Sequence, residues 1–440
     1  MNADSTAEAD TRRSRIARFI KSPMVSTSGA GLGVYALAVV TGPLLARDLA
    51  PSGRGDLAAV LVPSEMLGWV LAFGLPTAAL YYADRYTIRQ MMTATWAFAV
   101  AVGGAVTLGL WFVVPRYLHH HDPTTVPWLR IFLLVAMLFV PATTAIQLLR
   151  LRADLVAYNV WRSLQLVLET VIIVGLHVTG RLDLTGALWA ALISCIVAYV
   201  GVIVYAHAWP AGPVIKRTLG DLVHYGGRLS VGSTANLLMN RLDQVVMVGL
   251  VTPAQLGIYA IAATAAMVSA SAAEGISTVL FSRLREAEEP DHASTALWSS
   301  VKWTLIASSA IAIVIGASSS VVIPLLFGKP FRDAVVPLLI LLPGQVVADV
   351  GRVISQKLLV DNRPGAVSRS LVAGTAVAIF LLYALVDRYG IKGAAIATSV
   401  SQVVFAGYVL VAATRRPRDD RRGSPAPDNG STSEPAIVRD

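Results

Sequence analysis

The chain is poor in two residue classes that most soluble proteins use freely. It has one cysteine, Cys195, in 440 residues, which excludes an internal disulfide and a cysteine-based zinc site within the chain. Charged residues make up only 14% of it, against about 25% in an ordinary globular domain. A water-soluble protein is therefore not expected, and we read the net charge of +9 as a signal of membrane topology, not of nucleic-acid binding.

Nucleotide-binding and catalytic motifs are also missing. There is no phosphate-binding loop signature and no credible Ser/His/Asp arrangement. The glycine-rich run at 28–33 follows no strand, so close helix packing explains it better than a nucleotide loop. His119, His120 and His121 are consecutive, and adjacent side chains rarely converge on one metal, so a solvated loop is expected. These absences predict a protein that is not an enzyme and uses no cofactor or metal.

Long apolar runs are what the sequence does contain. Hydrophobic residues make up 55% of the chain, and the runs reach the roughly 20 residues that a helix needs to cross a bilayer. They are continuous instead of alternating, which argues against a membrane barrel. The prediction is an all-α polytopic membrane protein with twelve transmembrane helices, near 27–47, 57–82, 90–114, 126–149, 160–178, 185–208, 229–251, 254–281, 299–326, 334–358, 366–386 and 391–414.

The two halves of the chain repeat each other weakly. With a shift of 202 residues, Pro51 lies on Pro253 and Gly55 on Gly257. With a shift of 207 residues, segment 149–163 lies on segment 356–370. Both matches fall at equivalent loop boundaries, which predicts two six-helix lobes forming a V around a central cavity. Such an internal repeat is typical of transporters that rock about a central site, although an ancient duplication without transport is the alternative.

Basic residues predict the orientation of the chain. Of the 36 Lys and Arg residues, 26 flank the span ends on the side of the termini and nine flank the other side. The positive-inside rule then predicts a plasma-membrane protein with both termini on the cytoplasmic side. The expected organisation is a basic tail at 1–24 that contacts anionic lipid, a lobe at 25–208, a cytoplasmic linker at 209–228, a lobe at 229–414 and a disordered cytoplasmic tail at 415–440.

Polar side chains inside apolar spans are the strongest candidates for a substrate site, because each is costly unless it faces a cavity or a partner. The seventh span has a stripe within an arc of roughly 100°, made of Ser233, Asn236, Asn240, Asp243 and Gln244, with Arg241 at its margin. Other spans contribute Glu65 and Glu274. Glu169 fits an ion pair and a cavity equally well, and Asp349 is expected to pair with Arg352.

Two segments resemble a known family. The sequence NRLDQVVMVGLVTPAQLGIYAIA, followed by AAEGISTVLFSRLRE, resembles the seventh and eighth helices of polysaccharide-type flippases. LARDLAPSGRGDLAAVL, followed by FGLPTAALYYADR, resembles their first two helices. These flippases belong to the multidrug/oligosaccharidyl-lipid/polysaccharide exporter superfamily. The related lipid II flippases usually have fourteen spans, and Ser282 stands where many relatives have proline.

The resemblance implies movement of an undecaprenyl-pyrophosphate-linked oligosaccharide from the inner to the outer leaflet. The implied partners are this lipid-linked glycan, membrane lipids and the machinery of polysaccharide synthesis. Within that function, Arg241 suits the pyrophosphate, because guanidinium binds such oxygens in a fork. The remaining candidates divide into Asn236, Asn240 and Gln244 for sugar hydroxyls, and Asp243, Glu65 and Glu274 for a coupling proton or cation. A cation-coupled multidrug antiporter and a non-transporting membrane scaffold are the alternatives.

Overall fold

The structure, a computed structural model, describes residues 23–152, 154–210, 213, 215–270, 273, 275–277, 279–280, 284, 290–361 and 363–415. This part of the chain is helical throughout and contains no strand, so the all-α prediction is confirmed. Its helices are α2 (Pro23–Ala72), α3 (Leu75–Tyr81), α4 (Ile88–Phe98), η1 (Ala99–Gly103), α5 (Gly104–Tyr117), α6 (Thr125–Leu151), α7 (Leu155–Val178), α8 (Leu184–Tyr205), α9 (Lys216–Val248), α10 (Pro253–Ala266), η2 (Met267–Ser269), α12 (Pro290–Phe327), η3 (Lys329–Ala334), α13 (Val335–Val360) and α14 (Pro364–Thr414).

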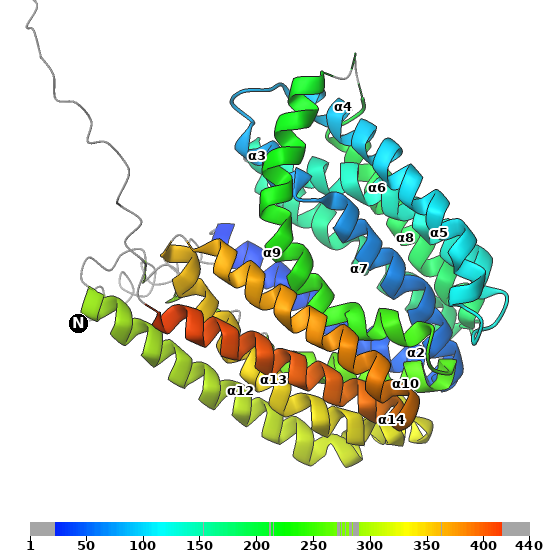
Figure 1. The fold of residues 1–440 in the computed structure, drawn as a ribbon. Helices are drawn as coiled ribbons and strands as arrows, with labels where there is room; N and C mark the ends of the chain where they lie inside the picture. Colours follow the sequence, from blue (N-terminus) through cyan, green and yellow to red (C-terminus); the bar gives the residue numbers. More distant parts are fainter. Residues whose placement is uncertain are drawn as a thin grey trace, which may run out of the picture.

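The two longest helices each contain a sharp reversal. α2 has non-helical backbone at Ala50, and α14 has it at Gly390. Proline at 51 disfavours helical backbone at Ala50, and glycine accepts the positive φ at 390 without steric cost. Arg363, just before α14, donates to the carbonyl of Ala412 near the other end of that helix, at 3.0 Å. Each label therefore covers two segments that fold back on each other (Figure 1).

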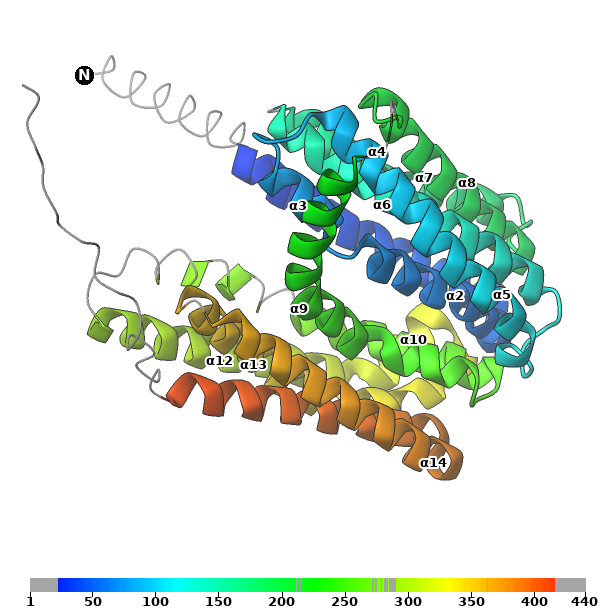
Figure 2. The same cartoon turned by 45° about the horizontal axis from the view of Figure 1, so that its top comes forward.

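The helices form two lobes. The N-lobe contains α2 to α8, and the C-lobe contains α10 to α14 with the last turns of α9. The lobes meet at one end, here the closed end, and run apart toward the other, the divergent end (Figures 1 and 2). One apolar core crosses the closed end, joining Leu57 and Ala59 of α2 to Leu256 and Tyr259 of α10. This is the two-lobe arrangement predicted from the repeat.

Repeat-related glycines make the contact at the closed end. A Cβ on Gly55 would overlap the carbonyl oxygen of Pro253, and one on Gly257 would overlap the carbonyl oxygen of Pro51. The contacts are reciprocal, as in an isologous interface. The pairs that align in the sequence, Pro51 with Pro253 and Gly55 with Gly257, therefore pack on each other in space. Only glycine at 55 and 257 permits this backbone approach.

The first turns of α9 lie within the segment predicted as the inter-lobe linker. Residues 216–228, expected within the linker at 209–228, are helical and pack on the N-lobe. Leu222 is buried in the N-lobe core, and Tyr86 donates to Asp221 at 2.6 Å. The Tyr225 ring stacks on Tyr81, with centroids 4.1 Å apart. The segment is too polar to read as a span, but these three anchors hold it as a helix. α9 therefore joins the two lobes.

Eight helices of the described part are long and apolar enough to cross a membrane. One of them, Val40–Tyr81, includes the end of α2 and reaches into two predicted spans across the reversal at Ala50. Another, Pro364–Thr414, is α14 and covers two predicted spans across the reversal at Gly390. The count of twelve stays a prediction. The two terminal tails, apart from residues 23–24 in α2 and Arg415, lie outside the described residues, as does most of 281–289.

Candidate functional site

Four charged side chains on apolar helices interact electrostatically where the two lobes converge. Arg54 of α2 interacts with Glu169 of α7 and with Arg241 of α9. Glu169 interacts in turn with Glu65, further along α2. Glu65 is exposed and the other three are half-buried. We call Arg54, Glu65, Glu169 and Arg241 the charged cluster. It draws three members from the N-lobe and one from the helix that links the lobes.

Arg54 is a member that sequence reasoning missed. The predicted spans ended at 47 and resumed at 57, which placed Arg54 in a loop. In the structure the second segment of α2 begins directly after Ala50, so Arg54 lies in its first turn. Its Nε atom is buried without a hydrogen-bond partner in the described part of the chain. Proline just inside a helix start is the signal that would have found it, since Pro51 cannot donate a backbone hydrogen bond.

Arg241 is the C-lobe side of the charged cluster. No carboxylate among the described residues lies within 4.0 Å of the guanidinium of Arg241 or of Arg54. The alternative in which Arg241 pairs with Glu274 falls on a residue outside the described part. Two guanidiniums held within electrostatic reach of each other repel, and an anion between them would relieve that repulsion. Each can offer a two-pronged donor to phosphate oxygens.

Asp243 faces a different environment from Arg241. It is buried, and its Oδ2 accepts hydrogen bonds from the Tyr259 hydroxyl at 2.5 Å and the Thr398 hydroxyl at 3.1 Å. Its Oδ1 accepts from the backbone N–H of Gln244 at 2.8 Å. The two hydroxyl groups come from α10 and α14, so Asp243 fastens α9 to the C-lobe. The predicted polar stripe of α9 thus contains at least one residue turned into a lobe interior.

The other predicted residues are placed as follows. Asn240 is half-buried and has a partner, while Gln244 is buried with its Nε2 lacking one among the described residues. Asn236 lies in α9, but its side chain is outside the described part. The predicted pair of Asp349 with Arg352 is confirmed, since the Arg352 guanidinium donates to Asp349 Oδ1.

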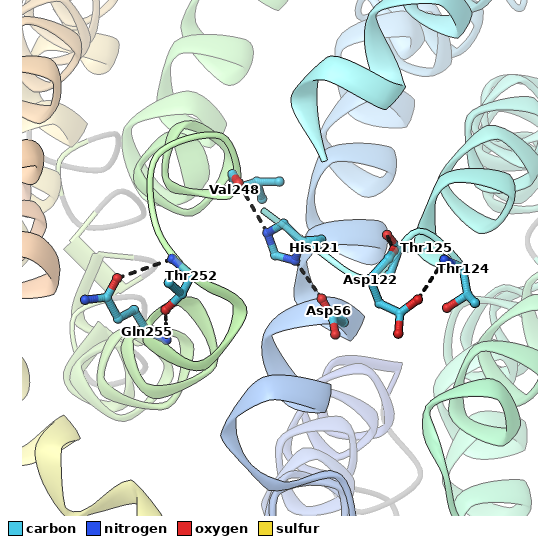
Figure 3. Close-up of polar contacts among 8 residues, drawn as sticks. All are labelled: Asp56, His121, Asp122, Thr124, Thr125, Val248, Thr252 and Gln255. Atoms are coloured by element: carbon cyan, nitrogen blue, oxygen red, sulfur yellow. Dashed lines mark hydrogen bonds and ion pairs between the residues drawn. The ribbon is translucent and has the colours of Figure 1, made fainter. Parts of the chain in front are cut away.

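A second polar group crosses the lobes at the closed end, where Figure 3 shows His121 between Asp56 and Val248. His121 lies between α5 and α6, and its side chain is fully buried. Its Nδ1 is 2.7 Å from Asp56 Oδ1, and its Nε2 is 3.2 Å from the Val248 carbonyl oxygen. We call these three residues the clasp. The expectation of a solvated histidine run is wrong for His121, because the loop folds inward against α9.

Further bonds join the lobes beside the clasp. The Tyr117 hydroxyl of α5 donates to the Val245 carbonyl of α9 at 2.6 Å. Arg47 Nε of α2 donates to the Leu326 carbonyl at the end of α12, at 2.9 Å. The closed end is thus held by backbone carbonyls of the C-lobe that accept from N-lobe side chains. No group of three or more His, Cys, Asp or Glu residues in the described part is arranged to hold a metal ion.

Comparison with known proteins identifies the family. The sequence profile described as "Polysaccharide biosynthesis protein" matches residues 22–286, more than half of the chain. The chain belongs to this family. No curated protein matches the sequence.

Solved structures show the same fold. The lipid II flippase MurJ in an inward closed conformation is 13% identical, with a TM-score of 0.75 over 89% of this chain and 88% of that one. An inward-facing multidrug MATE family transporter of the MOP superfamily is 14% identical, with a TM-score of 0.68 over 89% of this chain and 97% of that one. An outward-facing MATE transporter is also 14% identical, with a TM-score of 0.56 over 89% of this chain and 95% of that one.

The comparisons support the predicted family and fold. The family is the polysaccharide biosynthesis family that the resemblance implied, and the fold is shared with a lipid II flippase and with MATE transporters of the MOP superfamily. The chain is a multi-pass membrane protein with the fold of these transporters. Because the identity to the solved structures is low, the charged cluster and the clasp must be interpreted from this chain's own residues.

Proposed function

We propose that the protein is a flippase that moves a polyprenyl-pyrophosphate-linked oligosaccharide across the plasma membrane for cell-surface polysaccharide synthesis. The observation that carries this proposal is the arginine pair of the charged cluster. Arg54 and Arg241 interact across the two lobes while neither has a carboxylate within 4.0 Å among the described residues. Two guanidinium forks suit the several charged oxygens of a pyrophosphate. The family description supports the same substrate class.

The rest of the substrate sets further demands on the site. The glycan needs hydrogen-bonding groups, while the lipid tail can remain in the bilayer. Asn240, Gln244 and Asn236 on α9 are proposed for the sugar hydroxyls. Glu65 and Glu169 are proposed to take part in coupling, since both are acids within the charged cluster. Glu274 stays a proposal on the sequence alone, and Asp243 is better supported as the residue that positions α9.

The orientation proposed for this transport places both termini and the divergent end in the cytoplasm. The distribution of basic residues supports it through the positive-inside rule. The closed end then faces outward, and the divergent end faces the cytoplasm. The TM-scores with the inward closed MurJ, 0.75, and the inward-facing MATE transporter, 0.68, exceed the 0.56 of the outward-facing MATE transporter, which supports an inward conformation. Enzymes that assemble the glycan are proposed to deliver it from the cytoplasmic side.

A cation-coupled multidrug antiporter is the second candidate, favoured by the likeness to MATE transporters. Its weakness lies in the charged cluster. Glu65 and Glu169 balance the charge of the two guanidiniums, so the preference for an anion rests on the guanidinium forks, which bind phosphate oxygens and offer no ligand to an organic cation. The anionic head of a lipid-linked glycan fits the same two groups.

Replacement of either arginine tests the proposed function. In vesicles that contain a fluorescent polyprenyl-pyrophosphate oligosaccharide, Arg54→Ala and Arg241→Ala should each slow flipping about 10- to 100-fold. That range corresponds to the loss of charge-assisted hydrogen bonds of about 1.5–3 kcal/mol. Exposure of the glycan to a glycosidase outside the vesicles measures the rate. Lysine at either position should retain partial activity, because charge persists without the fork.

Arg332→Ala is the matched control, since Arg332 is exposed in η3 near the closed end. It should flip at the wild-type rate. Gel filtration shows whether each variant is folded. Wild-type flipping by a folded Arg54→Ala/Arg241→Ala protein would rule out the proposed pyrophosphate site. Resistance to toxic compounds in cells, without any flipping in vesicles, would favour the antiporter.

A further inference from the structure

The clasp ties Val248 of the C-lobe to two N-lobe residues, from which it must separate if the closed end opens. Asp56 lies on α2, His121 lies in the loop after α5, and Val248 ends α9. Two belong to the N-lobe and one to the C-lobe. Both ring nitrogens of His121 are used, one toward each lobe, and the side chain is fully buried (Figure 3). The ring is therefore a bridge between lobes and cannot keep both bonds in an open state.

The clasp also requires a proton. A backbone carbonyl only accepts hydrogen bonds, so His121 Nε2 must carry hydrogen to bond Val248. A hydrogen must then also lie between His121 Nδ1 and Asp56 Oδ1, which are 2.7 Å apart. That hydrogen resides on either the imidazole or the carboxyl group. In both cases the pair holds one proton more than a neutral imidazole and a separate carboxylate.

The other ionisable groups of the elements around the ring do not bond to it. On α2, Arg54 interacts with the charged cluster and Arg47 donates to the Leu326 carbonyl. The Thr124 N–H lowers the pKa of Asp122, which therefore does not compete for the proton. His119 and His120 of the same loop are exposed, and their rings contact each other at a tilt of 43°. The remaining polar neighbours are Tyr117 on α5, which donates to the Val245 carbonyl, and Thr252 and Gln255, which cap α10. Asp56 is the one ionisable group bonded to the ring among the described residues.

We propose that His121 and Asp56 form a proton-binding site that locks the closed end, and that this end opens when the proton leaves. The inference rests on the proposed alternating access. The bond from His121 Nε2 to Val248 needs the additional proton and is lost when the closed end opens, so linkage favours closure at low pH. The site lies at the closed end itself, so its proton enters and leaves on that side and regulates opening without driving transport.

Distance measurements across the closed end test the proposal without any glycan. Spin labels at Arg181→Cys in the N-lobe and Lys392→Cys in the C-lobe, in a Cys195→Ser background, sit at exposed positions near this end. Raising the pH from 5 to 8 should transfer population from a short to a long distance. The ratio of closed to open protein should fall by up to about tenfold per pH unit, the slope for one linked proton.

Two substitutions separate a proton site from a merely structural contact. His121→Gln removes the titrating ring, so the pH response should disappear. Asp56→Asn supplies a permanent amide hydrogen to an unprotonated Nδ1, while Nε2 still donates to Val248, so this variant should stay closed at pH 8. A structural role for Asp56 predicts the reverse, because the substitution would then weaken closure. Gel filtration checks that both variants are folded.

His177→Gln is the matched control. His177 Nδ1 lies 2.5 Å from Asp48 Oδ2, a second His–Asp pair, but both residues belong to the N-lobe. Its removal should leave the pH response intact. A wild-type distance that does not change with pH, or an unchanged response in His121→Gln, would overturn the lock. Since no glycan is used, loss of flipping in vesicles with a normal pH response would contradict only the proposed function.

Discussion

At the scale of single residues, the buried carboxyl group of Asp243 shows how a polar residue in a span can be structural. Its partners are Tyr259 and Thr398, from two other helices of the C-lobe. Tyr259→Phe removes one donor and leaves the ring packing in place. We expect a loss of about 1–2 kcal/mol of stability. Thermal unfolding in detergent measures it.

Tyr389→Phe controls for loss of a hydroxyl group, because Tyr389 is 54% exposed and should change stability by less than about 0.5 kcal/mol. The structural role of Asp243 would be contradicted if Tyr259→Phe unfolded at the wild-type temperature while glycan flipping was lost. That combination would return Asp243 to the substrate site.

Single residues also show what could not be predicted from the sequence. The polar stripe on α9 follows from helical geometry, but the direction a helix face points depends on which neighbours pack on it. Sequence therefore grouped Asp243 with Arg241, although the structure gives them different surroundings. Arg54 was missed because its flanking glycines look like a loop, whereas Gly55 is required for contact with Pro253. His121 was missed because nothing local indicates that a loop folds inward.

At the scale of elements, the contact between α2 and α10 depends on glycine. A methyl group on Gly257 would overlap the Pro51 carbonyl oxygen, so Gly257→Ala should force the lobes apart at the closed end. The labels at Arg181→Cys and Lys392→Cys should then report the long distance even at pH 5. Gly109→Ala is the matched control, since a Cβ there meets nothing within 4 Å. An unchanged short distance in a folded Gly257→Ala protein would show that α10 shifts to accommodate the methyl group.

Element boundaries were predictable where hydropathy is continuous. The predicted spans at 126–149 and 185–208 overlap α6 and α8 closely, because long apolar runs have few other stable arrangements in a bilayer. The start of α9 was not predictable in the same way. Lys216 to Arg228 is polar, and its helix is held by contacts with Tyr81 and Tyr86, which lie far away in sequence. Hydropathy carries no information about such partners.

At the scale of the whole molecule, the reciprocal glycine contact suggests that the two lobes move as units about the closed end. Arg162 and Arg369 are repeat-related, exposed and on the divergent side of α7 and α14. Spin labels at these two positions should approach each other when the labels at Arg181→Cys and Lys392→Cys separate. Addition of the lipid-linked glycan should change both distances, in opposite directions, as expected for alternating access.

The opposite signs are the critical part of this prediction. Local fraying of one end would change one distance and leave the other constant. A general loosening of the protein would lengthen both. The glycan should also lose its effect in Arg54→Ala/Arg241→Ala, because a ligand shifts an equilibrium only through a difference in affinity between the two states. If opposite changes persisted in this double variant, the rocking motion would be supported, but the arginine pair would be ruled out as the site through which the glycan triggers it.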